Sequence, residues 1–175
     1  PHSRRTTPHQ QQPTLPSQPL TALPTLNCEG PIKDVFSNRI VGYSIDSRMK
    51  SRLAVTALEN AVARRGDIAG CVIHSDRGSQ FRSRKFLRSL AHYGMVGSMG
   101  RVASCGDNAA MESFFSLLQK NVLNRRSWTS REHLRIAIVT WIERTYHRRR
   151  RQHRLGRLTP IEFETIMNTP ATLAA

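Results

Sequence analysis

The fold is constrained most by a short apolar run that ends in a polar turn and lies between two helix-forming stretches. The run is Cys71–His74, and the turn that follows it is Ser75–Gly78. Apolar residues recur at helical spacing before the run, over Leu53–Val62, and after it, over Phe86–Ala91. A second candidate strand follows at Met95–Met99. Strands that alternate with helices in this way favour an α/β sheet covered by helices.

Turn and capping residues mark the other elements. Val35 and Phe36 on one side and Ile40–Ile45 on the other flank Ser37 and Asn38, which predicts a β-hairpin with its polar pair at the turn. Three further helices are predicted downstream, and the first of them is expected to run to about residue 124. Their starts are assigned to Asp107 or Asn108, to Thr129 with Glu132, and to Thr159 with Pro160 and Glu162.

Composition divides the chain into three parts. Residues 1–30 hold six of the nine prolines, four glutamines and only three charged side chains. Such a segment cannot bury enough apolar surface to offset its chain entropy, so it is expected to be disordered. The folded part is expected over residues 31–166, and a flexible tail over residues 167–175.

The charge of the chain points to a polyanionic partner. Its 27 Lys and Arg against 12 Asp and Glu give a net charge of +15 and a pI near 11.4. An excess of this size favours nucleic acid as the partner. The sequence has no apolar run of the ~18 residues that a membrane-spanning helix needs, and its first residues lack the apolar core of a signal peptide. A cytoplasmic protein without a membrane partner is therefore expected.

The three cysteines, Cys28, Cys71 and Cys105, are an odd number at wide spacings, so they are expected to be reduced thiols. Cys71 and His74 have the spacing of half a zinc site. However, the sequence offers no second Cys/His pair at ligand spacing to complete it. A buried thiol and a packed strand histidine are the preferred interpretations.

Two carboxylates are the candidates for chemistry. Asp76 stands at a predicted strand end and Glu112 in a predicted helix, with 35 residues between them. Carboxylates from two elements can converge on hard cations such as Mg²⁺, which take oxygen ligands and leave positions open for phosphate. This pairing predicts phosphodiester chemistry that depends on Mg²⁺ or Mn²⁺. The simpler alternatives are a turn residue for Asp76 and a surface helix residue for Glu112.

A basic region forms the second candidate surface. Between Lys120 and Arg157 there are 12 Lys and Arg against two Glu, with Trp128, Trp141 and Tyr146 interleaved. Trp141 falls on an apolar stripe and is expected in the core. Four consecutive arginines cannot all leave one helix face, which favours a phosphate-binding turn over a solvated charged face. The predicted DNA contacts are Arg125, Arg126, Arg148, Arg149, Arg150, Arg151 and Arg154.

Three motifs follow one another along the chain: HSDRGSQF at residues 74–81, DNAAMESFF at 107–115, and the arginine-rich stretch Tyr146–Pro160. Together they resemble the integrase-type catalytic core of bacterial insertion-sequence transposases, over about residues 31–166. The resemblance implies a ribonuclease H-like mixed sheet flanked by helices and a two-metal site for DNA transposition. Asp76 would be the second catalytic acid and metal ligand and Glu112 the third, with Ser75 and Asn108 supporting them.

That family also has an Asp on the first strand of its sheet, and its counterpart is not found in this sequence. Residues 1–30 contain no Asp and only Glu29 as an acid. Asp34 fits the family's hairpin-turn aspartate instead, and is expected to have a structural role. A truncation or frameshift is therefore expected, with the first strand missing or incomplete and the metal site incomplete.

The sequence thus predicts a transposase catalytic-core fragment that binds DNA, with metal-dependent cleavage and strand transfer as its chemistry. Activity of this particular chain is expected to be defective. Its partners would be the element ends, target DNA, and another copy or a full-length transposase. The competing hypothesis is a non-catalytic nucleic-acid-binding protein, either a transposase remnant or an unrelated basic protein.

Overall fold

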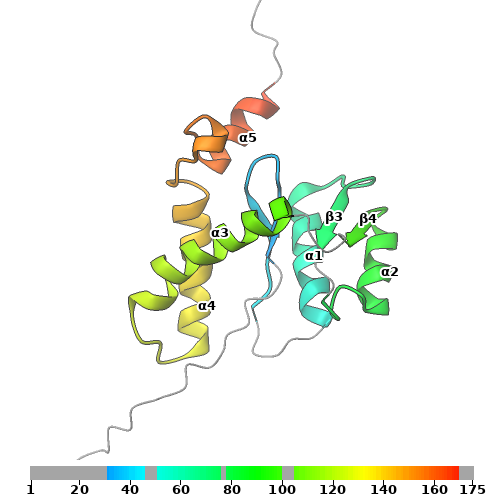
Figure 1. Cartoon of the computed structure of the whole chain (residues 1–175), viewed down its shortest axis with the longest axis horizontal. Coiled ribbons are helices and arrows are strands. Elements are labelled where there is room, and N and C mark those ends of the chain that lie inside the picture. Colours follow the sequence, from blue (N-terminus) through cyan, green and yellow to red (C-terminus); the bar gives the residue numbers. More distant parts are fainter. Residues whose placement is uncertain (1–30, 46–50, 76–77, 100–104, 170–175) are drawn as a thin grey trace, which may run out of the picture.

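The computed structural model describes residues 31–45, 51–75, 78–99 and 105–169. The predicted disorder of residues 1–30 therefore lies outside the described residues. Figure 1 shows a hairpin near residue 40 between two groups of elements. Residues 51–99 form the group on one side, and the helices of residues 105–146 form the group on the other.

The described strands form two separate pairs. They are β1 (Ile32–Lys33), β2 (Ile40–Gly42), β3 (Val72–Ser75) and β4 (Val96–Met99). β1 pairs with β2 in antiparallel fashion, and β3 pairs with β4 in parallel. The first sheet strand that the family pattern requires would fall within residues 1–30, outside the described residues.

Asp34 shapes the hairpin turn. Its Oδ1 accepts a hydrogen bond from the Phe36 amide at 2.8 Å, and its Oδ2 accepts one from the Ser37 hydroxyl at 3.2 Å. These bonds form a local turn of the kind that Asp favours, in agreement with the structural role expected for it. Val35 and Phe36 consequently lie exposed in the turn, so their prediction as a strand is wrong. The strand before the turn is β1 instead.

A strand–helix–strand unit follows the hairpin. Helix α1 (Ser51–Arg65) packs against β2 and against α2 (Arg84–His92), which connects β3 to β4. Gly42 permits the contact between β2 and α1, since a Cβ there would collide with the carbonyl oxygen of Ala57. Gly66 has a left-handed backbone with φ 72° and ends α1. Both predicted helices and both predicted strands of this region are confirmed.

The remaining elements are helices. They are α3 (Cys105–Asn121), the 3₁₀ turn η1 (Leu123–Arg125), α4 (Arg131–Thr140), the π-helical turn η2 (Trp141–Tyr146), the 3₁₀ turn η3 (His153–Leu155) and α5 (Pro160–Asn168). α4 continues directly into η2, and α3 crosses both (Figure 1). None of the described helices has the length and apolar character needed to cross a membrane.

Two of the predicted helix starts are wrong. α3 begins at Cys105, so Asp107 and Asn108 lie inside the helix, which also ends three residues earlier than expected. α4 is capped by Ser130 and not by Thr129: the Ser130 hydroxyl accepts a hydrogen bond from the amide three residues on, at 3.2 Å. Adjacent polar residues are comparable caps, and the backbone of the folded chain selects among them.

Two apolar cores hold the elements together. The larger lies among β2, α3, α4 and η2, and the smaller among α1, α2 and β3. Trp141 and Tyr146 are both buried in the larger core, and both pack against Phe114, Trp141 with tilted rings at a centroid distance of 6.0 Å and Tyr146 edge-to-face at 5.2 Å. The expectation that Trp141 belongs to the core is confirmed.

Helix α5 is capped by its own first residues and is tied to the rest of the molecule by Glu164. The capping box predicted at its start is confirmed, since the Thr159 hydroxyl accepts from the Glu162 amide and the Glu162 carboxylate accepts from the Thr159 amide. One turn further on, Glu164 is buried and forms ion pairs with Arg39, at 2.7 Å, and with Arg65. The two arginines belong to the hairpin and to α1, so this Glu164 cluster joins three separate elements.

His147 is fully buried directly after η2. Its Nε2 accepts a hydrogen bond from the Ile40 amide at 3.0 Å, so the proton of the neutral ring is on Nδ1, where Glu143 accepts it at 3.2 Å. Burial lowers the pKa of His147, and the charges of Arg39 and Arg64 act in the same direction, while Glu143 opposes them. The fold therefore favours the neutral ring.

This preference predicts a loss of stability in mild acid. Below a pH of about 6.5 the unfolded chain protonates His147 before the folded chain does, so the free energy of unfolding falls as the pH drops toward the lower folded pKa. His147→Gln keeps an acceptor for the Ile40 amide and removes the titration. The free energy of unfolding, measured in urea between pH 5 and 7, is expected to depend less steeply on pH in this variant than in the unmodified chain. Equal slopes in the two proteins would contradict the prediction.

Candidate acidic site and nucleic-acid interface

The two candidate acids are described unequally. Glu112 is an exposed residue in the first half of α3. Asp76 follows directly after Ser75, the half-buried last residue of β3, but Asp76 itself lies outside the described residues, as does the side chain of Asn108. The strand ends at Ser75, one residue later than the sequence predicts. The convergence of the two carboxylates stays a prediction.

A lysine of the hairpin lies against the same helix. Lys33 Nζ on β1 donates a hydrogen bond to the Ala110 carbonyl of α3 at 3.4 Å, two residues before Glu112. Burial, and next the charge of Arg154, lower the pKa of Lys33. The hairpin thus brings a basic group, and not a further carboxylate, to this part of α3.

The described residues contain no cluster of side chains that could hold a metal ion. No group of three or more His, Cys, Asp or Glu residues comes together among the residues that the structure describes. Cys71 and His74 are both exposed, so their interpretation as a buried thiol and a packed histidine is wrong. In β3 Ile73 faces the core, so its neighbour His74 faces outward by the alternation of the strand, whereas Cys71 stands just before the strand begins.

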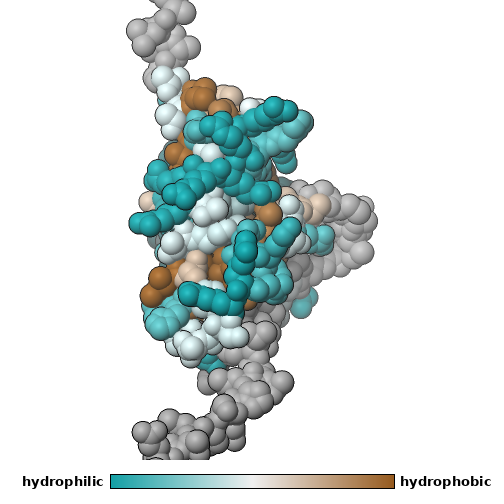
Figure 2. Space-filling model, turned by 90° about the vertical axis from the view of Figure 1, so that its left-hand side faces the viewer, coloured by the Kyte–Doolittle hydropathy of each residue, from teal (hydrophilic) through white to brown (hydrophobic). Residues whose placement is uncertain are grey.

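The arginine run begins in a turn, whereas the phosphate binding predicted for it stays a prediction. Residues 147–149 are a turn that follows η2, and all four arginines of Arg148–Arg151 are exposed. Arg151 lies 3.5 Å from Glu162 and donates to the carbonyl of Arg157. The other three arginines form no ion pair with a carboxylate of the described residues. Figure 2 shows hydrophilic side chains spread over this side of the molecule.

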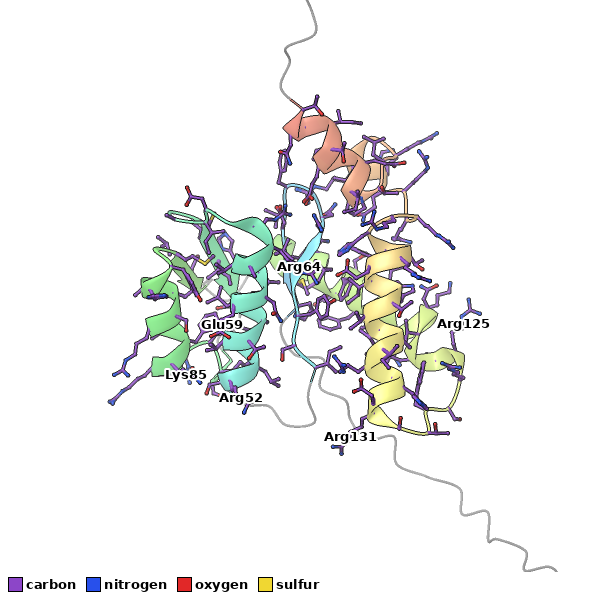
Figure 3. The ribbon with its side chains drawn as sticks, turned by 180° about the vertical axis from the view of Figure 1, so that it is seen from behind. Arg52, Glu59, Arg64, Lys85, Arg125 and Arg131 are labelled. Atoms are coloured by element: carbon purple, nitrogen blue, oxygen red, sulfur yellow. The ribbon has the colours of Figure 1, made fainter. Side chains whose placement is uncertain are left out.

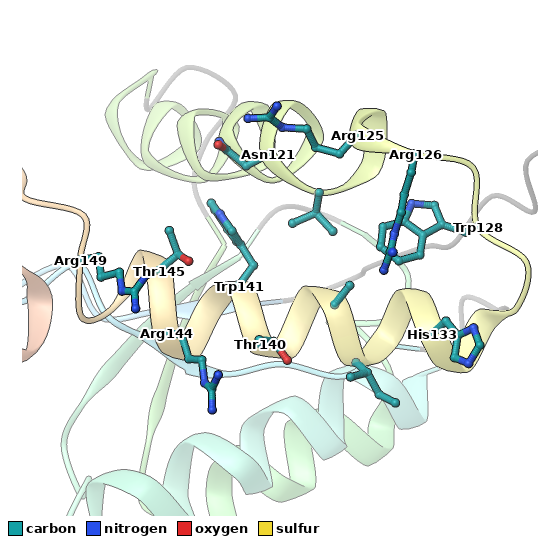
Figure 4. A pocket seen from close by; sticks show the side chains of 13 residues that line it. Asn121, Arg125, Arg126, Trp128, His133, Thr140, Trp141, Arg144, Thr145 and Arg149 are labelled. Atoms are coloured by element: carbon teal, nitrogen blue, oxygen red, sulfur yellow. The ribbon is translucent and has the colours of Figure 1, made fainter.

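A groove joins the two predicted groups of DNA-contacting arginines. It has a volume of about 770 Å³ and lies between the end of α3 with η1 and the α4–η2 helix. Arg125 and Arg126 line it from one side, and Arg149 from the other, together with Arg144 (Figure 4). We call this space the α3–α4 groove. Arginines more than 20 residues apart in the sequence therefore share one surface, whereas Arg154 is exposed on η3 and does not line the groove.

Sequence reasoning missed Arg144 and His133 as members of this surface. A signal for them existed, because the α4–η2 residues that line the groove recur at helical spacing. They are His133, Ile136, Ala137, Thr140, Trp141, Arg144 and Thr145. This stripe mixes apolar and basic residues, so a search for an apolar face overlooks it.

Comparison with known protein families identifies the family of this chain. Two sequence profiles, both described as "Integrase core domain", match residues 29–105 and 93–160. The chain belongs to the integrase core family. This membership confirms the predicted relationship to the cores of insertion-sequence transposases, and it leaves the hypothesis of an unrelated basic protein without support.

The curated relatives of this integrase core are transposases. The chain is 36% identical over 131 residues to transposase InsF for insertion sequence IS3A of Escherichia coli strain K12, covering 75% of this chain and 46% of that protein. It is 39% identical over 134 residues to the transposase for insertion sequence element IS629 of Shigella sonnei, covering 76% and 44%. The chain thus spans about half the length of these relatives.

Solved structures confirm the predicted ribonuclease H-like fold of this integrase core. The HTLV-2 integrase catalytic core domain in complex with magnesium matches with a TM-score of 0.56 at 19% identity, covering 75% of this chain and 80% of that one. A simian T-cell lymphotropic virus intasome in complex with a PP2A regulatory subunit matches with a TM-score of 0.58 at 18% identity, covering 81% and 48%.

Proposed function

We propose that this integrase core acts on DNA as part of a transposase catalytic core. The observation that carries the proposal is the joint surface of exposed arginines along the α3–α4 groove and the Arg148–Arg151 turn, in a chain whose relatives are named transposases. Clustered arginines contact phosphates through bidentate hydrogen bonds, and they suit the DNA backbone without regard to sequence. The element ends and target DNA would be the bound partners.

The chemistry proposed for this core is cleavage and transfer of DNA strands. Asp76 and Glu112 would hold Mg²⁺ or Mn²⁺, as the family's second and third acids. Such ions neutralise the charge of the phosphodiester and assist both the attacking and the leaving oxygen. Of the proposed ligands, the described residues supply Glu112, an exposed carboxylate on α3. No counterpart of the family's first-strand Asp is found in residues 1–30, which favours a site with fewer acids than two metal ions need.

We therefore expect weak binding of one divalent ion and little or no strand cleavage. The test incubates the chain with labelled DNA that carries the element's ends, with and without Mn²⁺, beside the variants Asp76→Asn and Glu112→Gln. Paramagnetic broadening of protein signals by Mn²⁺ should fall in both variants. Robust cleavage that Asp76→Asn abolishes would overturn the expectation of a defective site, and absence of any DNA binding would overturn the proposed function.

The remaining partners follow from the same proposal. Another copy of this chain or a full-length transposase would be a suitable partner, since one of the matched integrase cores is described as trimeric and another match is an intasome. A protein that acts on bacterial DNA would work in the cytoplasm. Sedimentation of the chain with and without DNA would detect such assembly.

A further inference from the structure

Both tryptophans of the chain line the α3–α4 groove. Trp128 is half-buried after η1, and Trp141 reaches the groove from the start of η2 with 8% of its surface exposed. Figure 4 shows Trp141 between the two helices and Arg126 alongside Trp128. The groove therefore has an aromatic lining as well as a basic one.

The Arg126 and Trp128 side chains form a stack at one end of the groove. The guanidinium carbon of Arg126 lies over the indole ring, 4.4 Å from its centroid. The ring is held in place because its Nε1 donates a hydrogen bond to the Leu123 carbonyl at 3.3 Å. Nucleobases stack on aromatic rings such as indole and on flat guanidinium groups, so this pair offers both kinds of surface.

The charges around the stack are uncompensated in the part of the chain that the structure describes. Arg125, Arg144 and Arg149 also line the groove and are exposed, and its lining includes no Asp or Glu. None of the three forms an ion pair with a described carboxylate, whereas other arginines of the chain, such as Arg64 and Arg135, do. A ligand with negative charges on either side of a flat ring would complement this arrangement.

We infer that the α3–α4 groove binds an unpaired stretch of a DNA strand. One base stacks on the Arg126–Trp128 pair, and the flanking phosphates contact Arg125, Arg144 and Arg149. The inference rests on the proposed function and adds a substrate form to it. In a duplex the base faces are covered by neighbouring bases, so only an unpaired base can use the aromatic stack, while the Arg148–Arg151 turn needs phosphates alone.

The position of the two tryptophans provides a direct test, because all tryptophan emission of the chain comes from the groove. The full chain is titrated with a single-stranded oligothymidylate, with a duplex of the same length and with inorganic polyphosphate, at one ionic strength. The single strand is expected to quench the emission through stacking. Polyphosphate is expected to bind with little quenching, since it has no bases.

Two variants measure the contribution of the stack. Trp128→Leu is expected to weaken single-strand binding about tenfold, the size of effect that loss of one base–aromatic stack produces, and to change duplex affinity by less than about twofold. Arg126→Ala, at an exposed site that does not endanger the fold, is expected to weaken the single-strand affinity several-fold. Phe36→Leu and Arg52→Ala are matched controls, because Phe36 is an exposed aromatic residue of the hairpin and Arg52 lies far from Arg125 (Figure 3).

The outcomes separate this inference from the proposed function. Equal quenching by polyphosphate and oligothymidylate, or unchanged single-strand affinity in both groove variants, would overturn the inference. The proposed function would stand in that case as long as the chain still bound duplex DNA. If the unmodified chain binds neither form of DNA, the proposed function fails as well.

Discussion

Replacing Arg148–Arg151 with glutamine is expected to weaken duplex DNA binding roughly a hundredfold or more near physiological salt. Each phosphate contact that is lost lowers the slope of log affinity against log salt by about 0.9, so loss of two to four contacts flattens it by roughly 2–4. The arginines lie in an exposed turn, and three of the four have no ion pair with a described carboxylate. Affinity measured over a series of salt concentrations gives the slope.

Two further variants identify the cause. Changing the same four residues to lysine keeps the charge and removes the bidentate geometry, so the salt slope should remain while affinity falls moderately. Arg52→Gln, on the opposite part of the molecule, should lower the DNA affinity and the salt slope much less than the glutamine variant of the turn does. A salt slope that the glutamine variant leaves unchanged would remove this turn from the DNA-binding surface.

The fold could be predicted from the sequence where periodic apolar residues and glycines agree. The stripe from Leu53 to Val62 ends at Gly66, and α1 ends there. The prediction failed where neighbouring residues compete for one role. Thr129 and Ser130 can both cap a helix, and only the folded backbone shows that Ser130 does so. Phe36 is a residue type that favours strands. However, the Asp34 side chain accepts a hydrogen bond from the Phe36 amide and holds this segment in a turn.

The candidate site could be predicted only in part, for a related reason. A run of four arginines is visible in any sequence, and its length alone excludes a single helix face. The α3–α4 groove depends on α3 crossing α4, which brings Arg125 and Arg126 close to Arg144 and Arg149. Nothing local in the sequence specifies that crossing. The prediction that Trp141 belongs to the core is confirmed, yet Trp141 also lines the groove. A residue near a helix crossing can pack in the core and still present part of its surface to the groove.

Glu164→Ala is expected to lower the free energy of unfolding by about 3 kcal/mol, since the variant leaves Arg39 without its ion-pair partner and Arg65 with Asp34 alone. Burial would raise the pKa of Glu164, but hydrogen bonds from Arg65, Ser37 and Arg39 outweigh it and hold the pKa below its usual value. The carboxylate is therefore charged in the fold, and its removal leaves two arginines at the junction of the hairpin, α1 and α5 without that partner.

Thermal unfolding followed by circular dichroism measures this effect, and a loss of 3 kcal/mol corresponds to a drop in melting temperature on the order of 10 °C. Glu132→Ala is the matched control, because Glu132 pairs with Arg135 at 2.7 Å on the exposed surface of α4, where water and salt screen the pair. That variant should hardly change the melting temperature. If the two variants melt at the same temperature, the Glu164 cluster does not hold α5 to the hairpin and α1 in the way its contacts indicate.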